Sequence, residues 1–185
     1  MAMNRRDALK SVMVMMGGTM VGSTAILTGC APEQQIEGLN FSPEDIAFLD
    51  EIGDTIIPET DTPGAKATGI GAFMVMMVKD TYDAEQQKTF VDGLNSIRKD
   101  FKSTKGSDFM EASSEDRLAY LNGMYEQYKT SKGEEAKVIN MLRDLTVLGY
   151  FSSEIGATQA LNYVEVPGRF DPCIPWNEGD KAYAI

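Results

Sequence analysis

In this chain of 185 residues, which contains no histidine, the carboxylates and two cysteines are the candidates for acid–base, metal and redox chemistry. Without an imidazole, Ser-His-Asp and Cys-His nucleophiles, histidine metal ligands and histidine proton switches are excluded. Glu51 with Asp54, or Asp54 with Glu59, supplies the pair of carboxylates that glycoside hydrolysis uses. Such pairs are expected by chance among 28 acidic residues, so a carboxylate enzyme is only a competing hypothesis.

The motifs of metal and nucleotide cofactor sites are missing from the sequence. Gly69 and Gly71 lack the third glycine and the preceding strand of a dinucleotide fingerprint. Cys30 and Cys173 form no CxxC pair for zinc, haem or an iron–sulfur cluster. The net charge of −11 argues against a nucleic-acid partner, since phosphate binding depends on Lys and Arg. We therefore expect no cofactor, no metal and no catalytic residue in this chain.

Residues 1–29 form a candidate signal peptide. Arg5, Arg6 and Lys10 precede nineteen uncharged residues, 11–29, a length that just suffices to cross a membrane. Nearly half of this stretch is small or polar, which disfavours a permanent anchor and favours a cleaved signal.

Two short motifs specify the kind of signal. Residues 4–10, NRRDALK, resemble the twin-arginine export signal, although Ala8 stands where a bulky residue is usual, and Sec export is the alternative. Residues 27–30, LTGC, resemble the lipobox of bacterial lipoproteins. That resemblance implies cleavage before Cys30 and acylation of its thiol; a cysteine placed there by chance is the competing interpretation.

The charge of the mature chain makes a lipid anchor necessary for membrane attachment. Cleavage removes Arg5, Arg6, Lys10 and Asp7, which leaves 14 basic and 27 acidic side chains, a net charge of −13. Anionic lipid repels such a chain, whereas a multiply acylated Cys30 anchors it stably. We expect an exported protein on the periplasmic side, with the outer membrane mildly preferred because Ala31 provides no retention signal of the Asp type.

The mature chain is predicted to be all-α, with a tether over residues 30–41 and a single domain of four to six helices over 42–161. Ser42 and Asp45 predict a capping box around Pro43, with a helix to about Ile57 that Pro58 ends. Residues 58–65 are rich in turn formers and predict a loop.

Four more helices follow from the spacing of apolar residues. Residues 70–78 are apolar on nearly all sides, which predicts a buried central helix or a helix that a partner covers, with the core favoured. Three amphipathic stretches come next, the second starting at a capping box of Ser113 and Asp116. Their apolar stripes are Phe90, Leu94, Ile97 and Phe101; Leu118, Leu121, Tyr125 and Tyr128; and Val138, Leu142, Leu145 and Gly149.

The tail, residues 162–185, is rich in proline and aromatic residues and is predicted to be extended and irregular. Its rings must dock on its own domain or on another chain, and the sequence leaves both open. Cys173 lies here as the remaining thiol, either buried and inert or available for an intermolecular disulfide.

Three stretches together resemble a known family. They are residues 56–65, IIPETDTPGA; residues 149–158, GYFSSEIGAT; and residues 166–170, VPGRF. In this order they resemble the gluconate 2-dehydrogenase subunit 3 family, over roughly residues 40–176.

The resemblance implies a small non-catalytic subunit of a membrane-associated dehydrogenase that oxidises sugars, polyols or sugar acids. FAD and the chemistry belong to a large partner subunit, and a cytochrome c-type subunit commonly passes on the electrons. The leader would export the folded large subunit as a passenger, and the lipobox departs from family members that a cytochrome subunit holds at the membrane. Candidate interface residues are Asp61, Pro63, Gly64, Gly149, Tyr150, Glu154, Gly156, Arg169 and Trp176, for which a purely architectural role is the equal alternative.

A stand-alone periplasmic lipoprotein that acts as a scaffold or binds a ligand is the alternative function. Flavin copurifying with the protein would separate the two, because this chain contains no flavin motif of its own.

Overall fold

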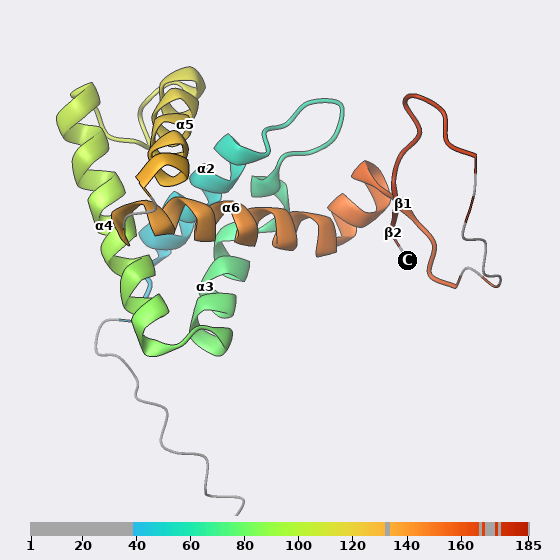
Figure 1. Cartoon of the computed structure of the whole chain (residues 1–185), viewed down its shortest axis with the longest axis horizontal. Coiled ribbons are helices and arrows are strands. Elements are labelled where there is room, and N and C mark those ends of the chain that lie inside the picture. Colours follow the sequence, from blue (N-terminus) through green and yellow to red (C-terminus); the bar gives the residue numbers. More distant parts are fainter. Residues whose placement is uncertain (1–38, 132–133, 167, 169–172, 174, 185) are drawn as a thin grey trace, which may run out of the picture. The chain divides into compact units, whose positions relative to one another are not determined.

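The computed structural model describes residues 39–131, 134–166, 168, 173 and 175–184, apart from the side chains of 131, 134–136 and 184. The predicted signal peptide, with Arg5, Arg6 and Cys30, and most of the predicted tether lie outside this part of the chain. The prediction of an all-α domain is confirmed: the described residues form five α-helices, labelled α2 to α6 (Figure 1). None of these helices is long and apolar enough to span a membrane.

Helix α2, Pro43–Ile56, begins at the predicted capping box. The Ser42 hydroxyl accepts from the Asp45 amide at 3.2 Å, and the Asp45 carboxylate accepts from the Ser42 amide at 2.8 Å. Phe48, Leu49 and Ile52 bury one face of the helix. Ile57 is the C-cap, and Pro58 follows it as expected.

A 3₁₀ turn, η1 (Ala65–Thr68), leads into α3 (Ile70–Thr81). Gly69 joins them with φ of +68°, a left-handed conformation that glycine adopts at no steric cost. Helix α3 is only partly the buried central helix that the sequence predicted: Met74 and Val78 are fully buried, but Met76 is 49% exposed. Its all-round apolar composition therefore leaves apolar surface facing outward.

Helices α4 (Ala84–Lys105) and α5 (Ser114–Ser131) also start at side-chain caps. Asp83 and Gln86 form a reciprocal capping box for α4, and the Ser113 hydroxyl accepts from the Asp116 amide at the start of α5. These local hydrogen bonds satisfy amides that have no partner inside the helix.

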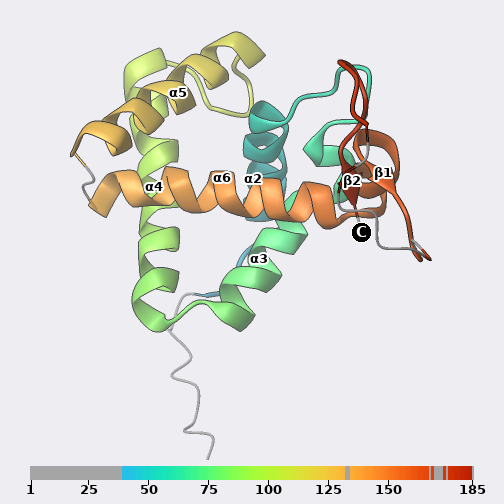
Figure 2. The same cartoon turned by 45° about the vertical axis from the view of Figure 1, so that its right-hand side comes forward.

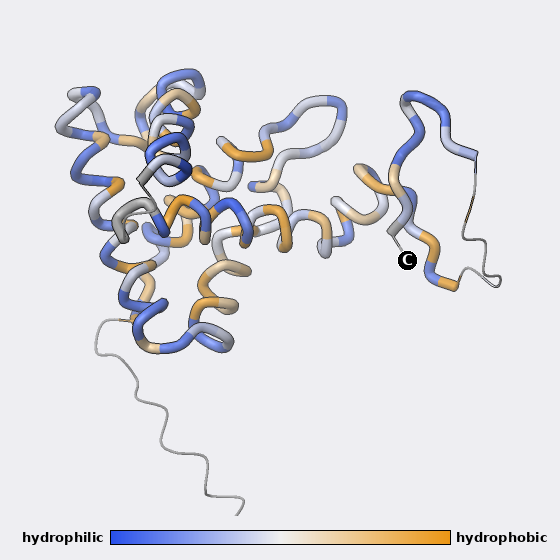
Figure 3. Tube along the Cα trace, viewed as in Figure 1, coloured by the Kyte–Doolittle hydropathy of each residue, from blue (hydrophilic) through white to orange (hydrophobic). Residues whose placement is uncertain are grey.

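Helix α6, Glu134–Ser152, is the central element instead of α3. It contacts each of the other four α-helices, and Figures 1 and 2 show it running across them. Its predicted apolar stripe is confirmed, since Val138, Leu142 and Leu145 are buried. The helix packs this stripe against the buried apolar faces of the other helices. Figure 3 shows apolar and polar residues alternating along the chain.

The chain leaves α6 through a π-helical segment, η2 (Gly156–Ala160), and enters the tail. The tail was predicted to be extended and irregular, and its described residues contain one short strand pair. Strand β1 (Asn162–Tyr163) pairs in parallel with β2 (Tyr183–Ala184), and Lys181 donates to the Gln159 carbonyl. The ends of the tail are thereby held together beside η2.

Candidate functional site

The loop between α2 and η1 is fastened to the end of α6 by Tyr150. The Tyr150 hydroxyl donates to the Pro63 carbonyl at 2.8 Å and lies 3.3 Å from the Thr62 hydroxyl. The Ala65 amide donates to the Ile57 carbonyl at 2.9 Å, which closes the base of the loop. Tyr150 is 1% exposed. Two stretches about ninety residues apart in the sequence thus form one structural unit.

Gly64 lets this loop close against α2. A Cβ atom at position 64 would lie 2.5 Å from the Asp54 Oδ1 atom and 2.7 Å from the Glu59 amide nitrogen, inside any real contact distance. The contact with a backbone atom cannot be relieved by a change of rotamer. Glycine at this position is therefore required for packing.

Gly149 and Gly156 play similar architectural parts at the end of α6. A Cβ at position 149 would lie 2.4 Å from the Ile70 Cδ1 atom and 2.5 Å from Phe73 Cδ1, so the glycine admits α3 close to α6. A Cβ at position 156 would lie 1.9 Å from the Tyr150 carbonyl oxygen, because η2 folds back onto the end of α6. Of the candidate residues, Gly64, Gly149, Tyr150 and Gly156 are buried and shape the fold.

The other candidate residues face outward where the structure describes them. Asp61 and Glu154 are exposed, and Pro63 is half-buried. Trp176 is 68% exposed, and its indole nitrogen donates to the Asp180 carbonyl within the tail. Arg169 lies outside the described residues. Cys173 is exposed, which contradicts the alternative of a buried, inert thiol.

Sequence reasoning missed an apolar patch on the outer face of α6. Val147, Leu148 and Phe151 are 43%, 49% and 38% exposed, although they sit in a helix that is otherwise central to the core. Positions 147 and 148 lie one turn before 151, so the three side chains share one face. The sequence signal for this patch was the presence of three apolar residues at positions outside the buried stripe of 138, 142, 145 and 149.

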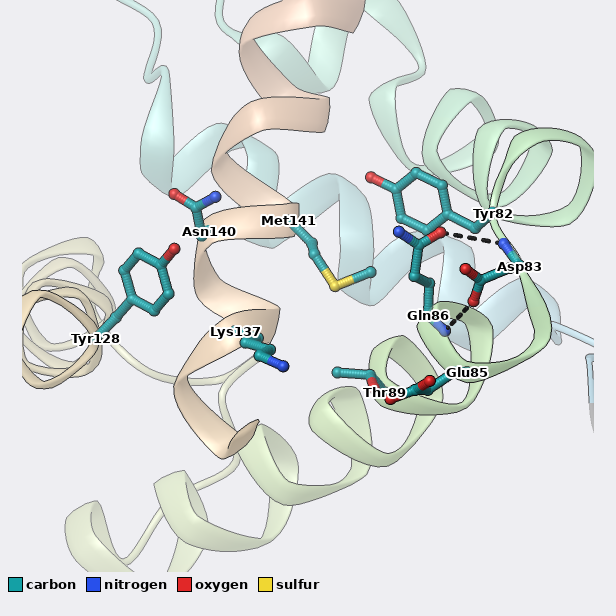
Figure 4. Close-up of a pocket in the computed structure, with 9 residues that line it drawn as sticks. All are labelled: Tyr82, Asp83, Glu85, Gln86, Thr89, Tyr128, Lys137, Asn140 and Met141. Carbon is teal, nitrogen blue, oxygen red and sulfur yellow. Dashed lines mark hydrogen bonds between the residues drawn. The ribbon is translucent and has the colours of Figure 1, made fainter. Parts of the chain in front are cut away.

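A surface cavity of about 490 Å³ lies where the corner between α3 and α4 meets α5 and α6 (Figure 4). Tyr82, Tyr128, Asn140 and Met141 contribute to its wall. Burial, with a smaller effect of the Asp144 charge, raises the pKa of Tyr82. Several of its polar groups already have partners: Asp83 and Gln86 cap α4, and Asn140 donates to Asp144. The cavity contains no histidine or cysteine to act as a nucleophile or base.

Glu51, an acid of the first candidate pair, does not have the surroundings of a proton donor. Glu51 is 12% exposed and forms ion pairs with Arg117 and, at 2.6 Å, with Lys66. Burial raises the pKa of Glu51, but the hydrogen bond from Lys66 and the charge of Arg117 outweigh it, and the net pKa is lowered. A carboxyl with a lowered pKa is unsuited to donate a proton at neutral pH. Within the described residues, no group of three or more acidic or cysteine side chains could hold a metal ion.

Comparison with protein families identifies the helical domain. The model of gluconate 2-dehydrogenase subunit 3 matches residues 43–168, from the first residue of α2 to the start of the tail. The chain belongs to the gluconate 2-dehydrogenase subunit 3 family. No curated protein and no solved structure was found to match it.

The family assignment makes this chain a subunit of a dehydrogenase complex. The matched region contains the loop with Asp61, Pro63 and Gly64, the end of α6 with Gly149 and Tyr150, and Gly156 at the start of η2. In this family member, these two stretches meet at the hydrogen bond from Tyr150 to Pro63. Arg169 and Trp176 lie beyond the matched residues.

Proposed function

We propose that this chain is the small, non-catalytic subunit of an FAD-dependent dehydrogenase that oxidises a sugar, polyol or sugar acid. The match to subunit 3 of gluconate 2-dehydrogenase over residues 43–168 carries this proposal, because it covers all five described α-helices. FAD and the reacting groups belong to the large partner subunit, with a cytochrome c-type subunit as the electron carrier. Glu51, a candidate catalytic acid, forms ion pairs with Lys66 and Arg117, which supports a structural role for this side chain.

The leader extends the proposal to export and anchoring. Arg5 and Arg6 would direct the folded complex through the twin-arginine route, and the large subunit would cross as a passenger. The lipid on Cys30 would then hold the complex at the periplasmic side of a membrane, with the outer membrane preferred. The net charge of −13 after cleavage supports a covalent anchor, because the polypeptide itself is repelled by anionic lipid.

Purification of the tagged protein from its native membranes in mild detergent tests the complex. We expect a large partner with the visible absorption spectrum of flavin, and sugar-dependent dye reduction by the pair. Recovery of this chain alone, folded and colourless, under conditions that keep other complexes intact would contradict the proposal and favour a stand-alone lipoprotein.

Two variants test export and anchoring separately. Replacing Arg5 and Arg6 together by Lys keeps the charge and should leave both this chain and the flavoprotein in the cytoplasm. Cys30→Ser should leave an exported but unacylated chain, released from the membrane. Normal export of the active dehydrogenase with the Lys pair would contradict the passenger mechanism without affecting the subunit assignment.

A further inference from the structure

Exposed apolar side chains of α6 and exposed acids occur where the α2–η1 loop meets the end of α6. We call this surface the loop–helix face and define it by Glu59 and Asp61 of the loop, Val147, Leu148 and Phe151 of α6, and Glu154, which follows α6. The Phe151 ring packs edge-on against the Tyr150 ring, with 5.1 Å between centroids, and the Tyr150 hydroxyl donates to the Pro63 carbonyl, so Phe151 is linked to the loop through Tyr150. We propose that the loop–helix face is the docking surface for the flavoprotein subunit, which meets it with an apolar patch bordered by Lys and Arg; this inference rests on the proposed function.

The apolar part of the face has no cover within the described chain. Val147, Leu148 and Phe151 are each more than a third exposed, although the core faces of the same helix are almost fully buried. The tail does not cover its own apolar side chains either, since Tyr163, Val166 and Trp176 are 51%, 78% and 68% exposed. Exposed apolar patches beside polar residues are typical of protein–protein contact sites.

The charge of the face specifies the partner. Glu59, Asp61 and Glu154 are exposed, and no ion pair to a described basic residue involves them. Three cations near these segments in the sequence are already engaged: Lys66 pairs with Glu51, Arg143 pairs with Asp144, and Lys181 donates to the Gln159 carbonyl. A second copy of this chain would bring acids against acids, and anionic lipid would be repelled in the same way. A protein surface with Lys and Arg around an apolar centre complements the face in both respects.

Close packing at three glycines indicates that the loop–helix face is formed before a partner binds. Gly64, Gly149 and Gly156 each allow a contact that a Cβ atom would block, so the loop, α6 and η2 are closely packed beneath the exposed residues. Preformed surfaces bind with less loss of conformational entropy than flexible ones.

Paired lysine variants of the full-length chain, purified from native membranes, test the apolar part. Val147→Lys with Leu148→Lys changes the face, and Met110→Lys with Leu118→Lys is the matched control, because these residues are 44% and 47% exposed on other elements. We expect the amount of flavin recovered per tagged chain to fall by about tenfold or more in the face variant, the loss typical of central interface residues. The control should stay within about twofold of wild type.

Charge reversal tests the acidic part by comparing two double variants of equal net charge. Glu59→Lys with Asp61→Lys is compared with Asp80→Lys with Glu111→Lys, which makes the same change in charge elsewhere on the surface. The face pair should slow assembly with the recovered flavoprotein by about tenfold at low salt and by less at high salt, and the control pair should not.

The outcomes separate the two proposals. If wild type recovers no flavoprotein, the proposed function fails; if wild type recovers it and the face variants match their controls, the docking surface is wrong. Dimerisation of the wild-type chain that the face variants abolish, or binding of the Cys30→Ser protein to anionic vesicles through this face, would also overturn the inference. Circular dichroism checks folding, and Leu148→Ser against Leu118→Ser repeats the test if a double variant does not fold.

Discussion

Replacement of Gly71 by alanine should unfold the protein more easily, because this glycine sets the distance between α2 and α3. A Cβ at position 71 would lie 2.3 Å from the Ile46 carbonyl oxygen and 3.0 Å from the Asp50 amide nitrogen, both backbone atoms of α2. The Gly71 amide also donates to the Asp50 carboxylate at 2.7 Å. Relief of the clash requires the two helices to separate, since no rotamer change moves these atoms.

The expected change in the free energy of unfolding of Gly71→Ala follows from two opposing effects. Overpacking costs about 1–3 kcal/mol in the free energy of unfolding, and rigid backbone contacts place Gly71 at the upper end. Alanine returns about 0.5–1 kcal/mol through its better helix propensity, so the net loss is about 2 kcal/mol. Gly123 in α5 is the matched control, because nothing lies within 4 Å of a Cβ there. Gly123→Ala should stabilise by about 0.5–1 kcal/mol.

Thermal and urea unfolding of the two variants provide the assay. A difference of about 3 kcal/mol between them corresponds to melting temperatures about 9 °C apart in a domain of this size. Equal stabilisation by both alanines would refute the reasoning, because it would mean that α2 and α3 can separate at no cost. Such a result would also weaken the same argument for the glycines beneath the loop–helix face.

Three further perturbations test other parts of the structure. Tyr150→Phe removes the hydrogen bond to the Pro63 carbonyl and should cost about 1 kcal/mol in urea unfolding; an unchanged midpoint would show that the loop is held by packing alone. Burial, with a smaller contribution from the charge of Asp100, raises the pKa of Tyr120 to about 12. The protonated tyrosine therefore makes its full contribution to the free energy of unfolding below about pH 10, and this contribution is lost as the pH rises toward 12. Absorbance titration should show a tyrosinate step near pH 12 that Tyr120→Phe removes, and its presence in the Phe variant would contradict the assignment. Glu51→Gln leaves Arg117 without its counter-charge and should cost about 3 kcal/mol at neutral pH. Because the pKa of Glu51 is lowered, wild type loses this advantage as the pH falls below about 4, and a gap between the two proteins that persists in acid would argue against the ion pair.

The order of helices could be predicted because their signals are local. Ser42 and Asp45 lie within one turn of each other, and Pro58 acts on the adjacent residue, so the start and end of α2 depend only on neighbouring residues. The family resemblance could be recognised for a similar reason, because each stretch that carries it, such as residues 56–65, is contiguous in the sequence. The match to residues 43–168 confirmed that resemblance.

Long-range contacts decided how the candidate residues are brought together and which of them are buried. The apolar pattern marked residues 70–78 as the central helix, but a central position depends on how many elements pack around a helix, and α6 holds it. The pairing of Tyr150 with Pro63 spans 87 residues, and no periodicity within either stretch encodes it. The exposure of Leu148 likewise depends on which neighbours leave that side of α6 uncovered. Hydrophobic spacing and capping residues determine where a helix forms, because those interactions act within a few residues; which of its faces stays open depends on the three-dimensional packing of distant segments.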